Sequence, residues 1–193
     1  MQKFSNRWIN YFFTIATDVA GQSKDPSTKV GCVVVDKNKH ILATGYNGFP
    51  VGMGDDSSRY QDRSFKLQHI CHAEANAICQ AAYTGMCFKD SFIFITLQPC
   101  IECSKLIIQS GIKEVHYLFD EQSNAAREKY LKEQGEDVLN DWRKSKDQAL
   151  KMLVECDISV YEHTFMRSST TNEIKTFKTS KFEFSATGDV IQV

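Results

Sequence analysis

The amino-acid sequence predicts an α/β fold, namely a three-layer α/β/α sandwich over a mixed five-stranded sheet. The main observation is the order of the segments, which alternate as helix, hairpin, helix, strand, helix, strand, helix, strand. A second observation is composition: 42% of the 193 residues are hydrophobic, which is enough apolar material for one buried core. No internal repeat interrupts this order.

The first part of the chain predicts a helix followed by a hairpin. Apolar residues recur at helical spacing over residues 6–20, and their stripe is most simply interpreted as core packing. The runs 30–36 and 41–46 are rich in β-branched and aromatic residues and predict two strands joined by a tight turn. Residues 48–69 show no clear periodicity, and connections of that length are usually functional or disordered.

The middle of the chain predicts two helices and two strands in alternation. An Ala-rich helix is expected over residues 73–83 and a second helix over residues 100–109. Apolar strands are expected over residues 91–96 and 114–119.

The last part predicts further helices and a final strand of the core. Residues 120–135 and 138–153 are helical in character, and 158–161 form a short strand. We expect one domain over residues 1–163 and a loosely held C-terminal extension over residues 164–193. The apolar residues of that extension that still favour strand pairing are Phe177, Phe182, Phe184 and the run 190–193.

The chain contains an H-x-E segment at His72 and Glu74 and a P-C-x-x-C segment ending at Cys100 and Cys103. This combination is typical of zinc sites that activate water for nucleobase deamination. A catalytic zinc ion takes three protein ligands of imidazole and thiolate type and keeps its fourth position for water. His72, Cys100 and Cys103 are therefore the predicted ligands. The ion lowers the pKa of its water from about 15.7 towards 7.

The spacing of these residues supports the same site. Cys100 and Cys103 lie three residues apart in the first turn of a predicted helix, where the helix N-terminus favours thiolate over thiol. His72 opens the other helix, so the two helix N-termini are expected to meet at one edge of the sheet. Glu74 then remains as the proton carrier, and the alternative is that it only complements the helix dipole.

Net charge and cysteine use limit the function classes. The net charge is −1, and the absence of a basic excess disfavours a nucleic-acid partner. No apolar run is long enough to cross a membrane, and we expect no membrane partner. Seven cysteines, an odd number, without a recognisable signal peptide indicate a reduced cytoplasmic setting, or the host cytoplasm for a viral protein.

Four segments carry a resemblance to a known family. They are 25–31 (DPSTKVG), 45–50 (GYNGFP), 71–78 (CHAEANAI) and 99–113 (PCIECSKLIIQSGIK). Together they resemble the deoxycytidylate (dCMP) deaminases of the cytidine deaminase superfamily, over about residues 8–119. The zinc segments alone indicate only the superfamily. The GYNGFP loop and the KLIIQSGIK run narrow the resemblance to the dCMP deaminases within it.

The resemblance implies hydrolysis of dCMP to dUMP and ammonia, which supplies the precursor of thymidylate, on a cytidine deaminase-like fold. It implies that Glu74 moves protons between water, ring N3 and the departing amine. Some members bind a second zinc through cysteines of the first loop, which here reads Asp25-Pro26, so we expect one zinc per chain.

Residues of the substrate site are also implied. Asn47 is expected at the sugar 3′-hydroxyl, and the competing interpretation is a left-handed turn residue before Gly48. A 5′-phosphate is expected beside the first strand, although exposed lysines such as Lys29 are more often only solvated. The expected substrate-binding residues are Asn47, Ser27, Thr28, Lys29, Ala73 and His69.

Regulation is implied by the same resemblance. Family members are typically homohexamers that dCTP activates together with Mg²⁺ and that dTTP inhibits. Tyr46, Gly48 and Asn76 match the effector site. Gly and Asp, which follow in this loop, are also common in any surface turn, so the alternative of an ordinary turn stays open.

Other functions remain open at this stage. Many members place a Tyr soon after the fourth strand, where this chain has Phe119 and then no Tyr at that spacing, which leaves room for dCTP as a substrate. A tRNA or single-stranded DNA deaminase would share the zinc segments. A non-catalytic nucleotide-binding zinc protein is the third alternative, although a purely structural site would not require Glu74.

Overall fold

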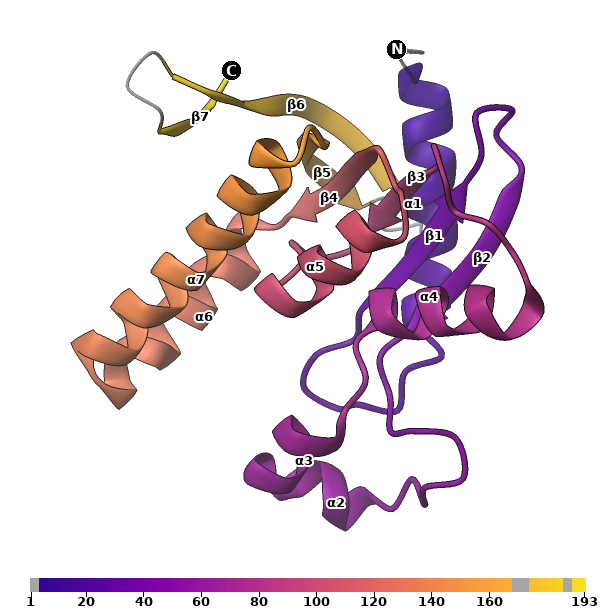
Figure 1. Cartoon of the computed structure of the whole chain (residues 1–193). Helices are drawn as coiled ribbons and strands as arrows, with labels where there is room; N and C mark the ends of the chain where they lie inside the picture. The colour runs from indigo at the N-terminus through magenta and orange to yellow at the C-terminus, as the bar shows by residue number, and fades with distance from the viewer. Residues whose placement is uncertain (1–3, 168–173, 186–188) are drawn as a thin grey trace.

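A computed structural model describes residues 4–167, 174–185 and 189–193. Its strands form one mixed sheet in the order β2-β1-β3-β4-β5-β6-β7 (Figure 1). The strands are β1 Gly31–Val35, β2 Ile41–Tyr46, β3 Phe92–Ile95, β4 Glu114–Phe119, β5 Ser159–Arg167, β6 Ile174–Phe184 and β7 Val190–Gln192. The helices are α1 Asn6–Ala20, α2 Ser57–Gln61, α3 Arg63–His69, α4 Ala73–Thr84, α5 Ile101–Gln109, α6 Glu121–Gln134 and α7 Glu136–Glu155.

Helices cover both faces of the sheet, so the predicted three-layer α/β/α sandwich is confirmed (Figure 1). Successive side chains of a strand point to opposite faces. In β1, Cys32 and Val34 belong to the core cluster that also contains residues of α4, α5 and α7, whereas Val33 and Val35 belong to the cluster that contains α1. All five residues of β1 are buried, as expected for a central strand that is covered twice.

The sheet has seven strands, so the prediction of five was wrong. The predicted strand at 158–161 covers only the beginning of β5, which pairs antiparallel with β6 over most of its length. The predicted pairing within the extension is confirmed, because Phe182 and Phe184 pair with Gln192 and Val190. β5 crosses the predicted boundary at residue 163, and the division into 1–163 and 164–193 stays a prediction. Phe177 belongs to β6, and residues 168–173 lie outside the described residues.

The connection over residues 48–69 is partly helical, because it contains α2 and α3. Neither helix could be recognised from the hydrophobic periodicity of the sequence, since helices of five and seven residues are too short to show a repeat. Within the described part of the chain, no helix combines the length and the apolar character that crossing a membrane requires.

Two glycines let helices lie unusually close to the hairpin. A Cβ atom at Gly31 would come within 2.1 Å of the Ala16 carbonyl oxygen of α1. A Cβ atom at Gly45 would come within 2.2 Å of the Ala73 carbonyl oxygen at the start of α4. Any side chain at either position would push the helix away, so these glycines set the positions of α1 and α4.

Candidate metal centre and substrate site

His72, Cys100 and Cys103 come together where α4 and α5 begin. His72 is the N-cap residue of α4 and Cys100 that of α5, so the predicted meeting of the two helix N-termini is confirmed. The Nδ1 atom of His72 lies 3.4 Å from the Sγ atoms of both Cys100 and Cys103. Among the described residues, this is the cluster of three potential metal ligands whose donor atoms all lie within 4.8 Å of one another.

This geometry fits a zinc ion. Tetrahedral zinc with bonds of about 2.3 Å to sulfur and about 2.0 Å to nitrogen separates those two donors by about 3.5 Å. The observed nitrogen to sulfur distances of 3.4 Å agree with that separation. Three ligands of this type leave a fourth position open, as a catalytic rather than a structural site requires.

The two thiols do not lose their protons independently. A hydrogen bond from Cys103 is the largest influence on Cys100 and, with His72, lowers the pKa of Cys100 to about 3. The same hydrogen bond raises the pKa of Cys103, and burial raises it further. The pKa of His72 is raised, mainly by its hydrogen bond to Cys100. A bound metal cation has the opposite effect on the pKa of Cys103, because it stabilises the thiolate and so lowers the pKa of a thiol that coordinates it.

Glu74 lies in the first turn of α4, directly beside the ligand cluster. Its side chain is only 4% exposed, and this burial raises the pKa of its carboxyl group. Hydrogen bonding to Cys103 and attraction to His72 act in the opposite direction. A buried carboxyl group with a raised pKa is suited to taking up and releasing a proton during turnover.

Asn47 is buried at the end of β2 and fixes the loop before β1. Its Nδ2 atom donates to the Thr28 carbonyl oxygen at 2.9 Å, and its Oδ1 atom accepts from the Val30 amide at 2.7 Å. The alternative of a left-handed turn residue is wrong, because Asn47 is not among the described residues with positive φ. Contact with a sugar hydroxyl stays a prediction.

The predicted phosphate-binding residues lie in the loop before β1. Ser27 and Lys29 are exposed and Thr28 is half-buried. The Nζ atom of Lys29 has one long contact of 3.5 Å to the Gly21 carbonyl oxygen. The Ser27 hydroxyl instead donates to Asp25 at 2.8 Å. The loop therefore presents the ammonium group of Lys29 outwards, while the hydroxyl group of Ser27 is bonded to Asp25.

His69 and Ala73 flank the histidine ligand. Ala73 is completely buried in the first turn of α4. The imidazole of His69 stacks on Phe65, with ring centroids 4.0 Å apart, and its Nδ1 atom lies 2.7 Å from the Phe65 carbonyl oxygen. His69 is thus held within α3, and its role beside a phosphate stays a prediction.

The residues predicted for an effector site connect β2 with α4. The Nδ2 atom of Asn76 donates to the Tyr46 carbonyl oxygen at 2.8 Å. Gly48 forms a two-sided backbone bridge with Cys71, with N···O distances of 3.1 and 2.8 Å. Tyr46, Gly48 and Asn76 therefore lie along one seam beside the start of α4.

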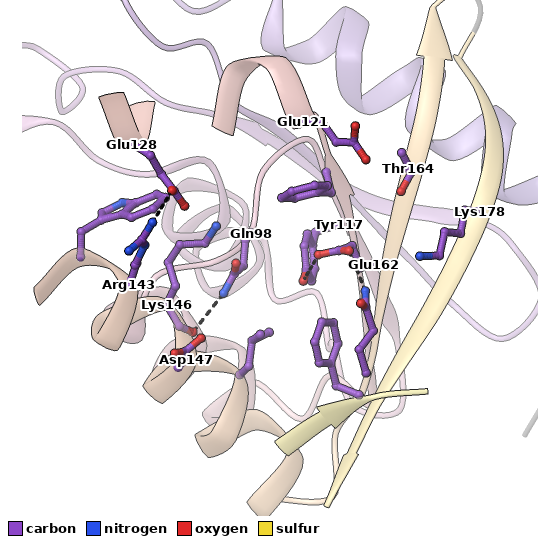
Figure 2. A pocket seen from close by; sticks show the side chains of 15 residues that line it. Gln98, Tyr117, Glu121, Glu128, Arg143, Lys146, Asp147, Glu162, Thr164 and Lys178 are labelled. Atoms are coloured by element: carbon purple, nitrogen blue, oxygen red, sulfur yellow. Dashed lines mark hydrogen bonds and ion pairs between the residues drawn. The ribbon is translucent and has the colours of Figure 1, made fainter. Parts of the chain in front are cut away.

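A cleft of about 580 Å³ lies between the α6–α7 hairpin and the sheet (Figure 2). Gln98, two residues before Cys100, lines it and donates to the Lys146 carbonyl oxygen at 3.0 Å. Tyr117 donates to Glu162 at 2.8 Å across its floor, and Phe119 lines it as well. None of the ligand cluster lines this cleft. Its cations are Arg143, Lys146 and Lys178, and its acids are Glu121, Glu128, Asp147 and Glu162.

Sequence reasoning missed a buried pair of opposite charge beside the loop. Asp25 is 2% exposed and Lys66 is 7% exposed, and the two are joined by an ion pair of 3.2 Å. The Asp-Pro-Ser-Thr order at Asp25 signals a turn in which the aspartate accepts backbone N–H groups. Lys66 carries no such signal, because a lysine in a polar segment is expected to be solvated.

The chain matches the family model described as the cytidine and deoxycytidylate deaminase zinc-binding region over residues 6–119. The chain belongs to this deaminase family. The match covers α1 to β4 and includes the complete ligand cluster and Glu74. The resemblance seen in the sequence is therefore confirmed at the level of the family.

Similar proteins agree with this family. A probable deoxycytidylate deaminase of Caenorhabditis elegans is 40% identical over 119 residues, which cover 60% of this chain and 59% of the relative. The Homo sapiens deoxycytidylate deaminase is 38% identical over 130 residues, which cover 62% of this chain and 72% of the relative. The match thus spans less than two thirds of the worm relative and of a Drosophila melanogaster relative, of which it covers 62%.

Solved structures show the same fold. The apo dCMP deaminase of the cyanophage S-TIM5 is 32% identical, with a TM-score of 0.51 over 59% of this chain and 84% of that chain. The same phage enzyme in complex with dCMP and dUMP has a TM-score of 0.61 over 83% of this chain and 99% of that chain. At 24% identity, the second comparison supports the fold alone.

Proposed function

We propose that this deaminase hydrolyses dCMP to dUMP and ammonia with one zinc ion per chain. The observation that carries the proposal is the ligand cluster of His72, Cys100 and Cys103 with the buried carboxyl group of Glu74 beside it. Relatives named as deoxycytidylate deaminases at 38–40% identity support the choice of dCMP. The matched phage enzyme was crystallised with dCMP and dUMP.

The chemistry divides between the ion and the protein. Zinc, when bound, lowers the pKa of a water molecule and so supplies a nucleophile near neutral pH. Glu74 accepts a proton from the attacking water and delivers it to ring N3, and water oxygen adds to C4. Glu74 then takes the remaining proton from the new C4 hydroxyl group and gives it to the amino group, so that the C4–N bond breaks, ammonia leaves and the C4 carbonyl forms. Burial of Glu74 keeps these transfers away from bulk water.

The proposed substrate contacts follow from position. Asn47 is proposed at the sugar because it follows the end of β2 beside α4, and Ala73 is proposed at the substrate because it lies next to His72. Ser27, Thr28 and Lys29 and, more distantly, His69 are proposed at the phosphate. The exposed ammonium group of Lys29 supports this assignment, because it is the group in the loop that is free to turn towards an anion.

Regulation is part of the proposal. We infer that dCTP with Mg²⁺ activates a homohexamer and that dTTP inhibits it, through Tyr46, Gly48 and Asn76. Supporting this is the hydrogen bond from Asn76 to Tyr46, which connects a predicted effector seam to the helix that carries His72 and Glu74. A ligand at that seam is therefore in direct contact with the catalytic helix.

A broader substrate range is the second candidate. Phe119 ends β4 and lines the polar cleft, so it brings an aromatic ring without a hydroxyl group to that position. In this second candidate function, the enzyme deaminates dCTP as well as dCMP.

The deciding experiment measures ammonia release from dCMP, dCTP, deoxycytidine and a single-stranded oligonucleotide with the zinc-loaded protein. Turnover of dCMP with little from deoxycytidine or the oligonucleotide supports the proposal. Turnover of dCTP at a similar rate supports the broader range instead. Absence of all turnover with zinc bound would favour a nucleotide-binding protein without catalysis.

The role of Glu74 has its own test. Glu74→Ala is expected to retain its zinc while losing at least about 100-fold in kcat, because the general acid and base is removed. Glu74→Gln is the matched variant, since it keeps the size and removes the proton carrier. Zinc content by elemental analysis and kcat for dCMP check both. Substantial activity in Glu74→Ala would disprove the assignment.

A further inference from the structure

The pair of Asp25 and Lys66 is a buried ion pair that the proposed chemistry does not use. Asp25 lies in the loop between α1 and β1, and Lys66 lies in α3, 41 residues later. The Nζ atom of Lys66 lies 3.2 Å from both carboxylate oxygens of Asp25. Burying two charges is costly unless both are paired and hydrogen-bonded, so their location calls for a role.

Asp25 organises the loop that precedes β1. Its Oδ1 atom accepts from the Ser27 amide and the Ser27 hydroxyl, each at 2.8 Å, and from the Thr28 amide at 3.3 Å. Burial alone raises the pKa of Asp25, but these bonds and Lys66 outweigh burial and the pKa is lowered. Lys66 also donates to the Ser27 hydroxyl. The ionised carboxylate thus fixes the path of the loop.

The same loop is tied to the metal centre from the other side. The side-chain amide of Asn47 holds Thr28 and Val30, as described above, and the hydroxyl of Ser23 donates to the Asn47 carbonyl oxygen at 2.8 Å. The next residue after Asn47, Gly48, is bridged to Cys71, the neighbour of His72. A continuous set of hydrogen bonds therefore runs from Lys66 to the segment that enters α4.

We propose that Asp25 and Lys66 form a positioning pair that holds residues 27–30 and Asn47 in the geometry that receives the sugar and phosphate of the substrate. The identity of that substrate rests on the proposed function. Lys66 acts through Asp25 and Ser27 and is not itself placed on the reacting atoms. Its loss should therefore raise KM for dCMP, while the ligand cluster, which is held by the N-termini of α4 and α5, is retained.

A purely structural pair is the competing interpretation, and the chain offers a matched control. Lys24 and Asp55 form a second Lys–Asp pair, at 2.9 Å, between the same loop and the connection after β2. Their side chains are 65% and 37% exposed, against 9% and 3% for Lys66 and Asp25. An exposed ion pair of this kind contributes little to stability. Lys24→Met therefore removes a lysine from the loop before β1 while the buried pair of Asp25 and Lys66 stays intact.

The test compares Lys66→Met, Asp25→Asn, the double variant, Lys66→Arg and Lys24→Met by zinc content, Tm, KM and kcat. Lys66→Met is expected to raise KM for dCMP about 10-fold or more, with kcat within about 3-fold at wild-type zinc content. The double variant removes both charges and should recover Tm but not KM. Lys66→Arg should restore KM, and Lys24→Met should leave it unchanged.

A wild-type KM in Lys66→Met, or a KM that recovers together with Tm in the double variant, would overturn the proposal. If Lys66→Met does not fold, the double variant and Lys66→Arg decide instead, again by whether KM for dCMP recovers together with Tm. Amide hydrogen exchange at Ser27 and Thr28 gives a readout without turnover. Faster exchange confined to this loop in Lys66→Met or the double variant supports positioning even for a protein inactive on dCMP, and unchanged exchange contradicts it.

Discussion

Lys29 is an exposed lysine of the loop before β1, and its ammonium group makes one long contact, of 3.5 Å, with the described residues. Lys29→Ala should raise KM for dCMP about 10-fold, because a charge-assisted contact to phosphate is lost, and should change kcat little. Steady-state kinetics check this result. Lys37→Ala, an exposed lysine in the hairpin turn, is the control, and an unchanged KM in Lys29→Ala would remove Lys29 from the phosphate site.

Individual residues of the metal centre were predictable because their chemistry is fixed by local spacing. His72, Cys100 and Cys103 each stand at a helix start that the sequence indicates, and zinc accepts few other residue types. The partner of Asp25 was not predictable, because Lys66 is 41 residues away and nothing in its neighbours distinguishes a buried lysine from a solvated one. The same holds for the contacts of Asn47, whose side chain serves the backbone of a distant loop.

The contact between β2 and α4 depends on one missing methyl group. At Gly45 a Cβ atom would lie 2.2 Å from the Ala73 carbonyl oxygen and 2.8 Å from the Ala77 amide nitrogen. Gly45→Ala must therefore displace the first turns of α4, which hold His72 and Glu74. We expect a loss of about 1–3 kcal/mol in the free energy of unfolding, with weaker zinc binding.

Chemical denaturation and zinc titration measure the two effects of Gly45→Ala. Gly48→Ala is the control for stability, because a Cβ atom at Gly48 would have no atom within 4 Å and the residue does not have a positive φ. Equal stability of the two variants would contradict the close approach of β2 and α4.

Helices and strands with many buried positions could be predicted from the sequence, whereas those with few buried positions could not. The predicted helix 6–20 coincides with α1, in which Phe12 and Phe13 pack in the core as expected, whereas Tyr11 of the same apolar stripe is 49% exposed. β6 and β7 were underestimated because KTSKFEF and VIQ mix polar and apolar residues near one edge of the sheet, so that no apolar run marks them as strands. Short helices and edge strands carry too few buried positions for a pattern to emerge.

The whole molecule contains a buried imidazole pair that links its stability to pH. His163 of β5 is completely buried, 3.0 Å from His116 of β4 and 2.9 Å from the Thr179 hydroxyl of β6, with Phe13 of α1 packed on its ring. Burial, and then repulsion from His116, lowers the pKa of His163 to about 2. Glu114 lies on the far side of His116, at 3.3 Å.

The direction of the pH effect follows from that pKa. Below an unfolded-state pKa of about 6.5, the unfolded chain binds a proton that the folded chain excludes, so stability is present above that pH and falls on acidification. One such group contributes up to about 1.4 kcal/mol per pH unit. Denaturation of the wild type between pH 7 and 5.5 should show this slope, and His163→Gln should reduce it. His40→Gln, at an exposed position, should not.

Regulation also belongs to the whole molecule. We expect dCTP with Mg²⁺ to convert a sigmoidal dependence of rate on dCMP into a hyperbolic one, and dTTP to oppose it. Asn76→Ala should weaken this response, because it removes the bond to Tyr46. Light scattering should give six times the chain mass of 22.0 kDa. A hyperbolic wild-type curve unaffected by dCTP would contradict the effector site.

The ligand cluster also has a consequence for the order in which the protein acquires its structure. Its members and Glu74 all fall within residues 72–103, so a ribosome completes the site before it has made α6, α7 and the last three strands. Closing the 28-residue interval between His72 and Cys100 costs about 3 kcal/mol of chain entropy. Zinc binding to small peptide sites provides about 10–16 kcal/mol. The nascent chain can therefore capture its metal ion while residues 104–193, nearly half of this sequence, are still to be translated.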